Sequence, residues 1–207
     1  MSGKAYVFAW SAVFAVSVGC HSGPTRISIP GVDAAAASAG ALELADKDGN
    51  GAISKAEAVV APSLLAEFDK YDANKDGSID ATEIESRIVS WTARGAKVVP
   101  ISFYVKMDGR PLEGAKVVLE PEPFMGAVLS RAESMVSGSG ACGPSVPQEL
   151  LSKEMPVGIF CGLYRMKVTH PDKQIPTRYN EQTELGIEIA PDYDFFHRKT
   201  FELSSKK

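Results

Sequence analysis

The sequence predicts an α+β protein of two domains, in which a helical domain is followed by an antiparallel β-sandwich. Two aspartate-rich segments of twelve residues lie among runs with helical periodicity in the first half. Apolar and polar residues alternate along several short segments of the second half, and the character of the chain changes at Arg94-Gly95. A length of 207 residues leaves room for one large or two small domains.

The two aspartate-rich segments have the spacing of calcium loops. Each has Asp at position 1, Asp or Asn at positions 3 and 5, Gly at position 6 and Glu at position 12. Calcium takes about six to eight oxygens, including a backbone carbonyl from position 7 and a water-bridged ligand at position 9. The candidate ligands are Asp46, Asp48, Asn50, Ala52, Ser54 and Glu57 in loop 1, and Asp72, Asn74, Asp76, Ser78, Asp80 and Glu83 in loop 2.

On these residues, the region from 34 to 92 resembles a pair of EF-hands. The resemblance implies two Ca²⁺ sites, each between an entering and an exiting helix. Gly51 and Gly77 stand where each loop turns sharply, a conformation that glycine adopts without steric penalty. Loop 2 contains four carboxylates and loop 1 contains three, so we expect loop 2 to be the tighter site.

Caps and breaks in the sequence predict the flanking helices. Asp33 is a candidate N-cap for an alanine-rich helix over residues 34–45. Ser54 begins a capping box that starts the exiting helix of the first hand. Pro62 ends that helix, and Ser63 can cap the next one. The short interval between the loops predicts middle helices of about two turns each.

The two hands are predicted to pair. Ile53 and Ile79 stand at position 8 of their loops, where they can form the short strand contact that joins two hands. The first helix has only Leu42 and Leu44 as large apolar residues, so this hand is expected to lean on its neighbour.

Period-two alternation in the second half predicts short strands. The alternating segments are 101–107, 115–119, 164–169 and 184–189, with a turn at Asp108-Gly109 between the first two. Several short strands separated by Gly and Pro favour an antiparallel sandwich.

Three runs in this half recur in a known family: V-K-M-D-G-R-P-L-E-G-A-K-V-V-L-E-P from Val105, G-L-Y-R-M-K-V from Gly162 and I-P-T-R-Y-N from Ile175. On these residues, the region from 98 to 203 resembles the transthyretin-like modules related to carboxypeptidase regulatory domains, which are common in exported bacterial proteins. The motifs are structural. The resemblance therefore implies a β-sandwich and no particular chemistry. We expect this sandwich to bind a protein or a glycan.

The first 19 residues are typical of a secretory signal. One lysine precedes an apolar run over residues 5–18, which is shorter than the ~20 apolar residues that cross a bilayer. The small residue before Cys20 resembles the lipobox of bacterial lipoproteins, which implies cleavage before Cys20 and lipidation of its thiol. The expected location is the cell envelope, anchored by lipid on the periplasmic side of the inner or outer membrane. Ordinary secretion is the alternative.

Lipidation of Cys20 leaves two cysteines, Cys142 and Cys161. An even pair in an oxidising compartment predicts a disulfide between them, with two buried thiols as the alternative. The full organisation is then a signal (1–19), a lipid anchor and tether (20–33), the EF-hand pair (34–92), a linker (93–97), the sandwich (98–203) and a tail (204–207).

The sequence predicts a calcium-binding envelope lipoprotein that is not an enzyme and in which Ca²⁺ is mainly structural. A nucleophile elbow, a phosphate loop, a zinc motif and a basic cluster are all absent from the sequence, which argues against catalysis and against nucleic acid as a partner. A calcium sensor that exposes a partner groove is the alternative. A metal-dependent enzyme in the sandwich is a weaker one, which would gather Tyr164, Tyr179, Tyr193, His170 and His197. The sequence leaves the oligomeric state open.

Overall fold

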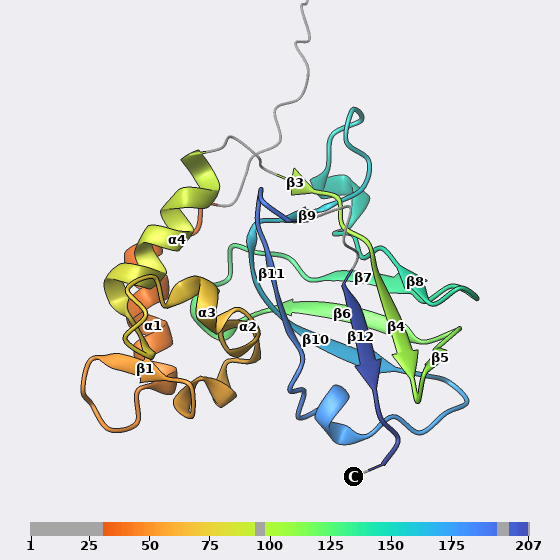
Figure 1. Ribbon diagram of the computed structural model, residues 1–207. Coiled ribbons are helices and arrows are strands. Elements are labelled where there is room, and N and C mark those ends of the chain that lie inside the picture. Colours follow the sequence, from red (N-terminus) through yellow and green to blue (C-terminus); the bar gives the residue numbers. More distant parts are fainter. Residues whose placement is uncertain (1–30, 94–97, 194–198, 207) are drawn as a thin grey trace, which may run out of the picture.

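The structure is a computed structural model that describes residues 31–93, 98–193 and 199–206 (Figure 1). The predicted signal, Cys20 and nearly all of the tether, residues 94–97 of the linker, and His197 lie outside these residues. Within the described ranges, no helix has both the length and the apolar character needed to span a membrane.

The helical part begins as the sequence predicts. Its elements are α1 Ala34–Ala45, β1 Ala52–Ser54, η1 Glu57–Val60, α2 Pro62–Ala66, α3 Phe68–Tyr71, β2 Ser78–Asp80 and α4 Ala81–Ala93. Asp33 caps α1 by accepting a hydrogen bond from the Ala36 amide at 3.1 Å, which confirms the predicted start of this helix. The strand contact between the two hands is also confirmed, because β1 and β2 pair with Ile53 opposite Ile79.

The middle helices differ from the prediction. The exiting helix of the first hand is only the 3-10 turn η1, and the entering helix of the second hand is divided at Glu67 into α2 and α3. Pro62 is the first residue of α2, a position where a missing N–H has no effect. Ser63 is not a helix cap, because it lies inside α2, whose N-cap is Ala61. Its backbone N–H and its hydroxyl both donate to Glu122 of the second half.

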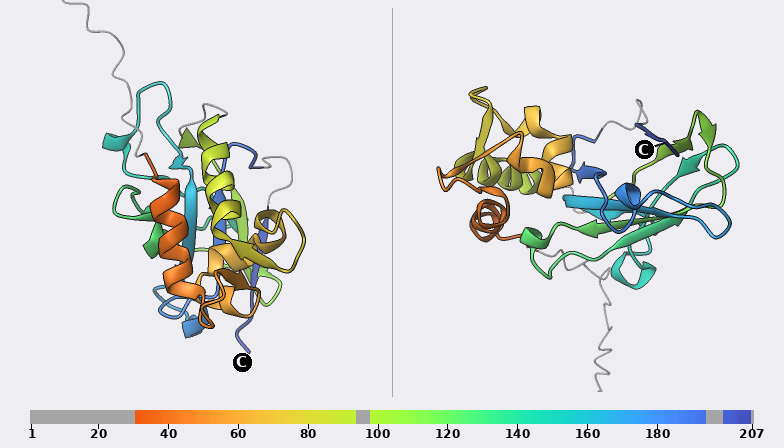
Figure 2. Two further views of the ribbon diagram at one scale, coloured as in Figure 1. Left: turned by 90° about the vertical axis from the view of Figure 1, so that its left-hand side faces the viewer. Right: turned by 90° about the horizontal axis from the view of Figure 1, so that it is seen from below.

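The alanine-rich sequence of α1 permits close packing on two sides. Helices α1 and α4 lie side by side (Figure 2), and α1 also packs on the turn η2 Pro123–Met125 of the second half. Its small residues Ala37 and Ala41 are buried. A Cβ added at Gly40 would lie 3.1 Å from the Cβ of Phe124, so glycine permits this close approach and a larger residue would crowd it. The first hand therefore leans on the β-rich part as well as on the second hand.

The second half is rich in strands and largely antiparallel. Its strands are β3 Val98–Val99, β4 Phe103–Met107, β5 Arg110–Pro111, β6 Lys116–Pro121, β7 Ala132–Met135, β8 Ala141–Cys142, β9 Ile159–Phe160, β10 Gly162–Thr169, β11 Gly186–Ile189 and β12 Thr200–Leu203. The 3-10 turns η3 Gln148–Leu150 and η4 Thr177–Tyr179 interrupt it. One sheet has the order β11-β10-β6-β7, a second has β12-β4-β5 with β8 also on β4, and β3 pairs with β9.

All four segments of alternating residues contain strands. One pair of strands departs from the antiparallel prediction, because β12 runs parallel to β4 with Thr200 opposite Tyr104. Buried side chains of both sheets and of the helical part belong to one hydrophobic core. The helical part therefore lies directly against one side of the β-rich part (Figure 1). The transthyretin-like arrangement of the strands stays a prediction.

The predicted disulfide is corrected by the structure, where Cys142 and Cys161 are both thiols. Cys142 lies on β8 opposite Phe103, where burial raises the pKa of its thiol and a hydrogen bond with Ser134 lowers it in part. Cys161 lies between β9 and β10, where burial and the negative charge of Glu188 both raise the pKa of its thiol. The two cysteines therefore lie in different segments of the β-rich part and have different neighbours.

We expect thiol labelling to show that Cys142 and Cys161 are both thiols. Burial raises the pKa of both thiols to about 11, so they should react slowly with a disulfide reagent in the folded protein at pH 8. In denaturant without reductant, residues 21–207 should release two thiol equivalents. No reactive thiol after unfolding would instead indicate the disulfide.

Candidate metal centre

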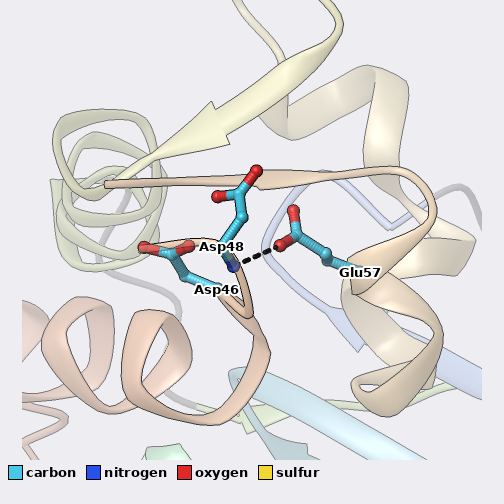
Figure 3. Close-up of side chains that lie close together, drawn as sticks. All are labelled: Asp46, Asp48 and Glu57. Atoms are coloured by element: carbon cyan, nitrogen blue, oxygen red, sulfur yellow. Dashed lines mark hydrogen bonds between the residues drawn. The ribbon is translucent and has the colours of Figure 1, made fainter. Parts of the chain in front are cut away.

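Loop 1 brings three acidic side chains together. One carboxylate oxygen each from Asp46, Asp48 and Glu57 lies within 4.8 Å of the other two (Figure 3). They come from the end of α1, the loop itself and the start of η1. Carboxylate oxygens at this spacing suit a hard divalent cation such as Ca²⁺.

Glu57 is folded into loop 1 by hydrogen bonds. Its carboxylate accepts from the Lys47 amide at 2.8 Å, from the Ser54 amide at 2.9 Å and from the Ser54 hydroxyl at 2.7 Å. The hydrogen bonds from Ser54 and the loop amides lower the pKa of Glu57 to about 2. The ligand at position 12 is therefore ionised at neutral pH and already closes the loop.

The other acidic residues of loop 1 are oriented in the same way. Asp46 accepts from the amides of Gly49 at 2.8 Å and Gly51 at 2.9 Å. Asp48 accepts from the amide of Asn50 at 3.1 Å. These bonds satisfy the backbone of the loop and set the side chains before any cation binds.

Loop 2 repeats this pattern. Glu83 accepts from the amides of Ala73 at 2.9 Å and Asp80 at 3.0 Å, as Glu57 does at the matching positions of loop 1. Asp72 accepts from the amides of Asp76 at 3.1 Å and Gly77 at 3.0 Å. Among the described residues, however, the compact group of three acids occurs in loop 1 alone.

The remaining candidate ligands lie at the starts of the two short strands and within loop 2. Ala52 and Ser78 begin β1 and β2, so each backbone carbonyl comes from the first residue of a strand. Asp80 accepts from the Glu83 amide at 2.9 Å, while Asn74 accepts from the Asp76 amide at 2.8 Å.

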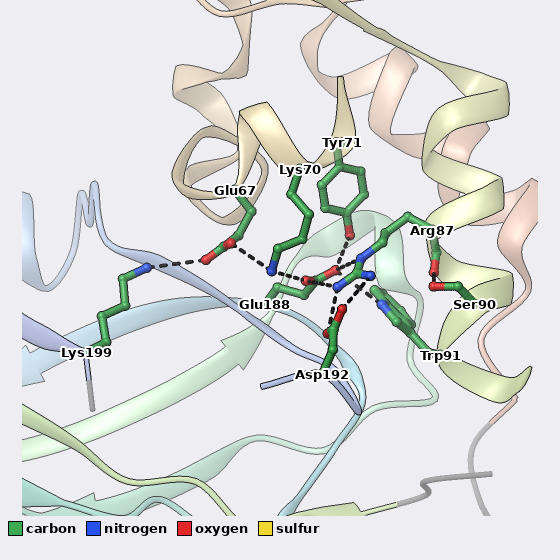
Figure 4. Close-up of polar contacts among 9 residues, drawn as sticks. All are labelled: Glu67, Lys70, Tyr71, Arg87, Ser90, Trp91, Glu188, Asp192 and Lys199. Carbon is green, nitrogen blue, oxygen red and sulfur yellow. Dashed lines mark hydrogen bonds and ion pairs between the residues drawn. The ribbon is translucent and has the colours of Figure 1, made fainter. Parts of the chain in front are cut away.

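Sequence reasoning missed Glu188, the centre of a polar cluster that joins the helical part to β11 (Figure 4). Its side chain is fully buried on β11 and accepts hydrogen bonds from Lys70, Tyr71, Arg87 and Trp91 of the helical part. Burial opposes its charge, but the hydrogen bonds from Arg87 and the charge of Lys70 hold its pKa below the ordinary value. In sequence it looks like the solvent-facing residue of an alternating strand, so no local signal distinguishes it.

A second buried carboxylate, Glu122, also joins the two halves. It accepts from the Ser63 amide at 3.1 Å and the Ser63 hydroxyl at 2.8 Å, and lies 3.5 Å from Arg165. Burial raises the pKa of Glu122. Its Oε2 and the Arg165 Nε are buried without a hydrogen-bond partner, so this contact is less well satisfied than the one at Glu188.

Comparison with known families supports the reading of the two loops. A family model described as EF hand matches residues 39–57 and 65–89. These segments contain all of loop 1 and all of loop 2. The match and the acidic cluster together indicate a calcium-binding protein. No curated protein and no solved structure matches the chain.

Proposed function

We propose that this chain binds Ca²⁺ in both loops and that the ions are mainly structural. The observation that carries the proposal is the shared internal geometry of the loops. In each, the glutamate at position 12 accepts amide hydrogen bonds from positions 2, 3 and 9, and is thereby folded onto its own loop. A preformed site binds its ion with little reorganisation.

The attachment of the helices supports a structural role over a sensor role. In a sensor hand, Ca²⁺ changes the angle between the two helices and opens a groove. Here both helices of the second hand, α3 and α4, are tied to β11 through Glu188. Opening this hand would break buried, charge-assisted hydrogen bonds, which are about twice as strong as neutral ones.

For the remainder of the protein, we propose an exported, lipid-anchored molecule whose transthyretin-like β-rich part binds a protein or a glycan and has no catalytic activity. The apolar run before Cys20 supports export. Two of the candidate ligands of an enzyme, Tyr164 and His170, are engaged in the fold. The Tyr164 hydroxyl donates to the Phe160 carbonyl at 2.9 Å, and His170 Nδ1 accepts from the Asp172 amide at 3.0 Å.

The proposal is tested by titrating residues 21–207 with calcium while heat, Trp91 fluorescence and thermal stability are followed. Removal of the signal removes Trp10, so Trp91 is the single tryptophan. We expect two binding events, loop 2 before loop 1, and a rise in stability of about 2.7 kcal/mol per site at 100 times the Kd. The Trp91 signal should change little, because its indole already lies buried against Glu188.

Other outcomes would contradict the proposal. A large change in Trp91 emission with submillimolar binding would favour the sensor. Absence of both heat and stabilisation would reject calcium binding altogether. Magnesium at the same concentrations is the control, since its strict octahedral geometry suits such loops poorly.

A further inference from the structure

Glu188 connects the β-rich part to both helices that flank loop 2 (Figure 4). From α3, it accepts hydrogen bonds from Lys70 Nζ at 2.9 Å and the Tyr71 hydroxyl at 3.0 Å. From α4, it accepts bonds from Arg87 Nε at 2.8 Å, Arg87 Nη2 at 2.7 Å and Trp91 Nε1 at 3.2 Å. One buried carboxylate thus contacts the chain on both sides of the loop.

We propose that Glu188 is a positioning residue for the calcium site of loop 2. It lies outside the loop and donates no ligand, but it fixes the ends of α3 and α4 relative to each other and thereby sets the affinity of loop 2. This inference rests on the proposed calcium binding and adds a determinant that belongs to the other half of the protein.

The connection to the ligands is short on both sides. Tyr71 directly precedes Asp72, the ligand at position 1. Arg87 follows Glu83, the ligand at position 12, by four residues, which is about one turn of α4. Because Glu188 binds Tyr71 and Arg87 together, it holds the first and last ligands of the loop at a set separation. Without these hydrogen bonds, the two ends of the loop would have to be ordered when Ca²⁺ binds. The free energy of that ordering would lower the affinity of loop 2.

The charge of Glu188 acts in the same direction. Lys70 and Arg87 bring two positive charges close to the ends of a loop that binds a divalent cation. Glu188 neutralises part of this charge, and Glu67 at 3.0 Å from Lys70 and Asp192 at 2.9 Å from Arg87 share the remainder. Removing the Glu188 charge would make this group of side chains one unit more positive, which weakens the attraction of the neighbouring loop for Ca²⁺.

Glu122 provides a matched control. It is the other buried carboxylate that joins the two halves, but its partner in the helical part is Ser63 at the start of α2. The partners of its side chain among the described residues are Ser63 and Arg165, and neither belongs to α3 or α4. A Glu122→Gln substitution therefore removes a charge from the same interface and leaves the flanking helices of loop 2 in place.

The experiment uses residues 21–207 with the Glu57→Gln substitution, which removes the closing carboxylate of loop 1. The heat of calcium binding then comes mainly from loop 2. Adding Glu188→Gln should weaken calcium binding about tenfold, and adding Glu122→Gln should change it less than about twofold. In the reverse background, with Glu83→Gln, the Glu188→Gln substitution should change the affinity of loop 1 less than about twofold. A general loss of stability would not produce this selectivity for one loop.

The results distinguish failure of the proposed calcium binding from failure of the proposed role of Glu188. If the Glu57→Gln parent binds no calcium, the proposed function fails. If the parent binds and folded Glu188→Gln binds equally well, or if Glu122→Gln loses as much, the role of Glu188 is overturned. Should circular dichroism show Glu188→Gln unfolded, Tyr71→Phe gives the same test with one hydrogen bond removed. It should weaken loop 2 about fivefold, and unchanged binding would reject the inference.

Discussion

Replacing Gly186 by alanine is expected to lower the free energy of unfolding by about 3 kcal/mol and to loosen the helical part from the β-rich part. Gly186 begins β11, and a Cβ there would overlap the backbone of Pro62 and Ser63 at the start of α2. Backbone atoms at the start of a helix cannot move away by a change of rotamer, as the end of a flexible side chain can. The added methyl group must therefore displace α2 as a whole.

Urea unfolding followed by Trp91 fluorescence and far-ultraviolet circular dichroism measures this effect. Gly31→Ala is the matched control, because a Cβ there meets no atom within 4 Å. Neither glycine has a positive φ, so the two substitutions differ in the space available and not in backbone strain. A Gly186→Ala protein within about 0.5 kcal/mol of the parent would show that this close contact does not hold the halves together.

Replacing Glu83 by glutamine should weaken calcium binding at loop 2 by at least about tenfold. Glu83 is the expected bidentate ligand, and its carboxylate is already turned toward the loop by the amides of Ala73, Asn74 and Asp80. An amide offers only one oxygen and no charge, so the closing ligand loses one contact and most of its attraction for the ion.

Glu85→Gln is the control for this substitution. Glu85 lies two residues further along α4 and accepts from the Ser38 hydroxyl at 2.8 Å, a bond that glutamine can also accept. It changes the net charge equally without touching the loop. Calorimetric titration of both variants should show a normal loop 2 in Glu85→Gln only. Equal affinity in both variants would remove Glu83 from the site.

The features that the sequence predicts correctly are those with local causes. Asp33 caps α1 because its side chain needs only an amide three residues away. The pairing of Ile53 with Ile79 follows from two loops of equal length. Alternation along 164–169 predicts part of β10, because a strand on one sheet buries every second side chain.

The missed features depend on distant partners. The sequence predicts Ser63 as a helix cap, but this residue lies inside α2, and its hydroxyl and amide both donate to Glu122, which is 59 residues away. Glu188 alternates with isoleucines like an exposed residue, and only donors about a hundred positions earlier make its burial tolerable. The parallel pairing of β12 with β4 was missed for a similar reason, because alternation predicts a strand but not whether its neighbour is parallel or antiparallel.

The contact between α2 and β11 also bears on the order of folding during synthesis. Pro62 and Ser63 leave the ribosome long before Gly186, against which they pack. Strand β12, which completes the sheet of β4, is made later still. Contacts of such sequence separation form slowly, because the intervening chain must first be closed into a loop. The helical part therefore lacks the surface on which it packs until β11 has been made.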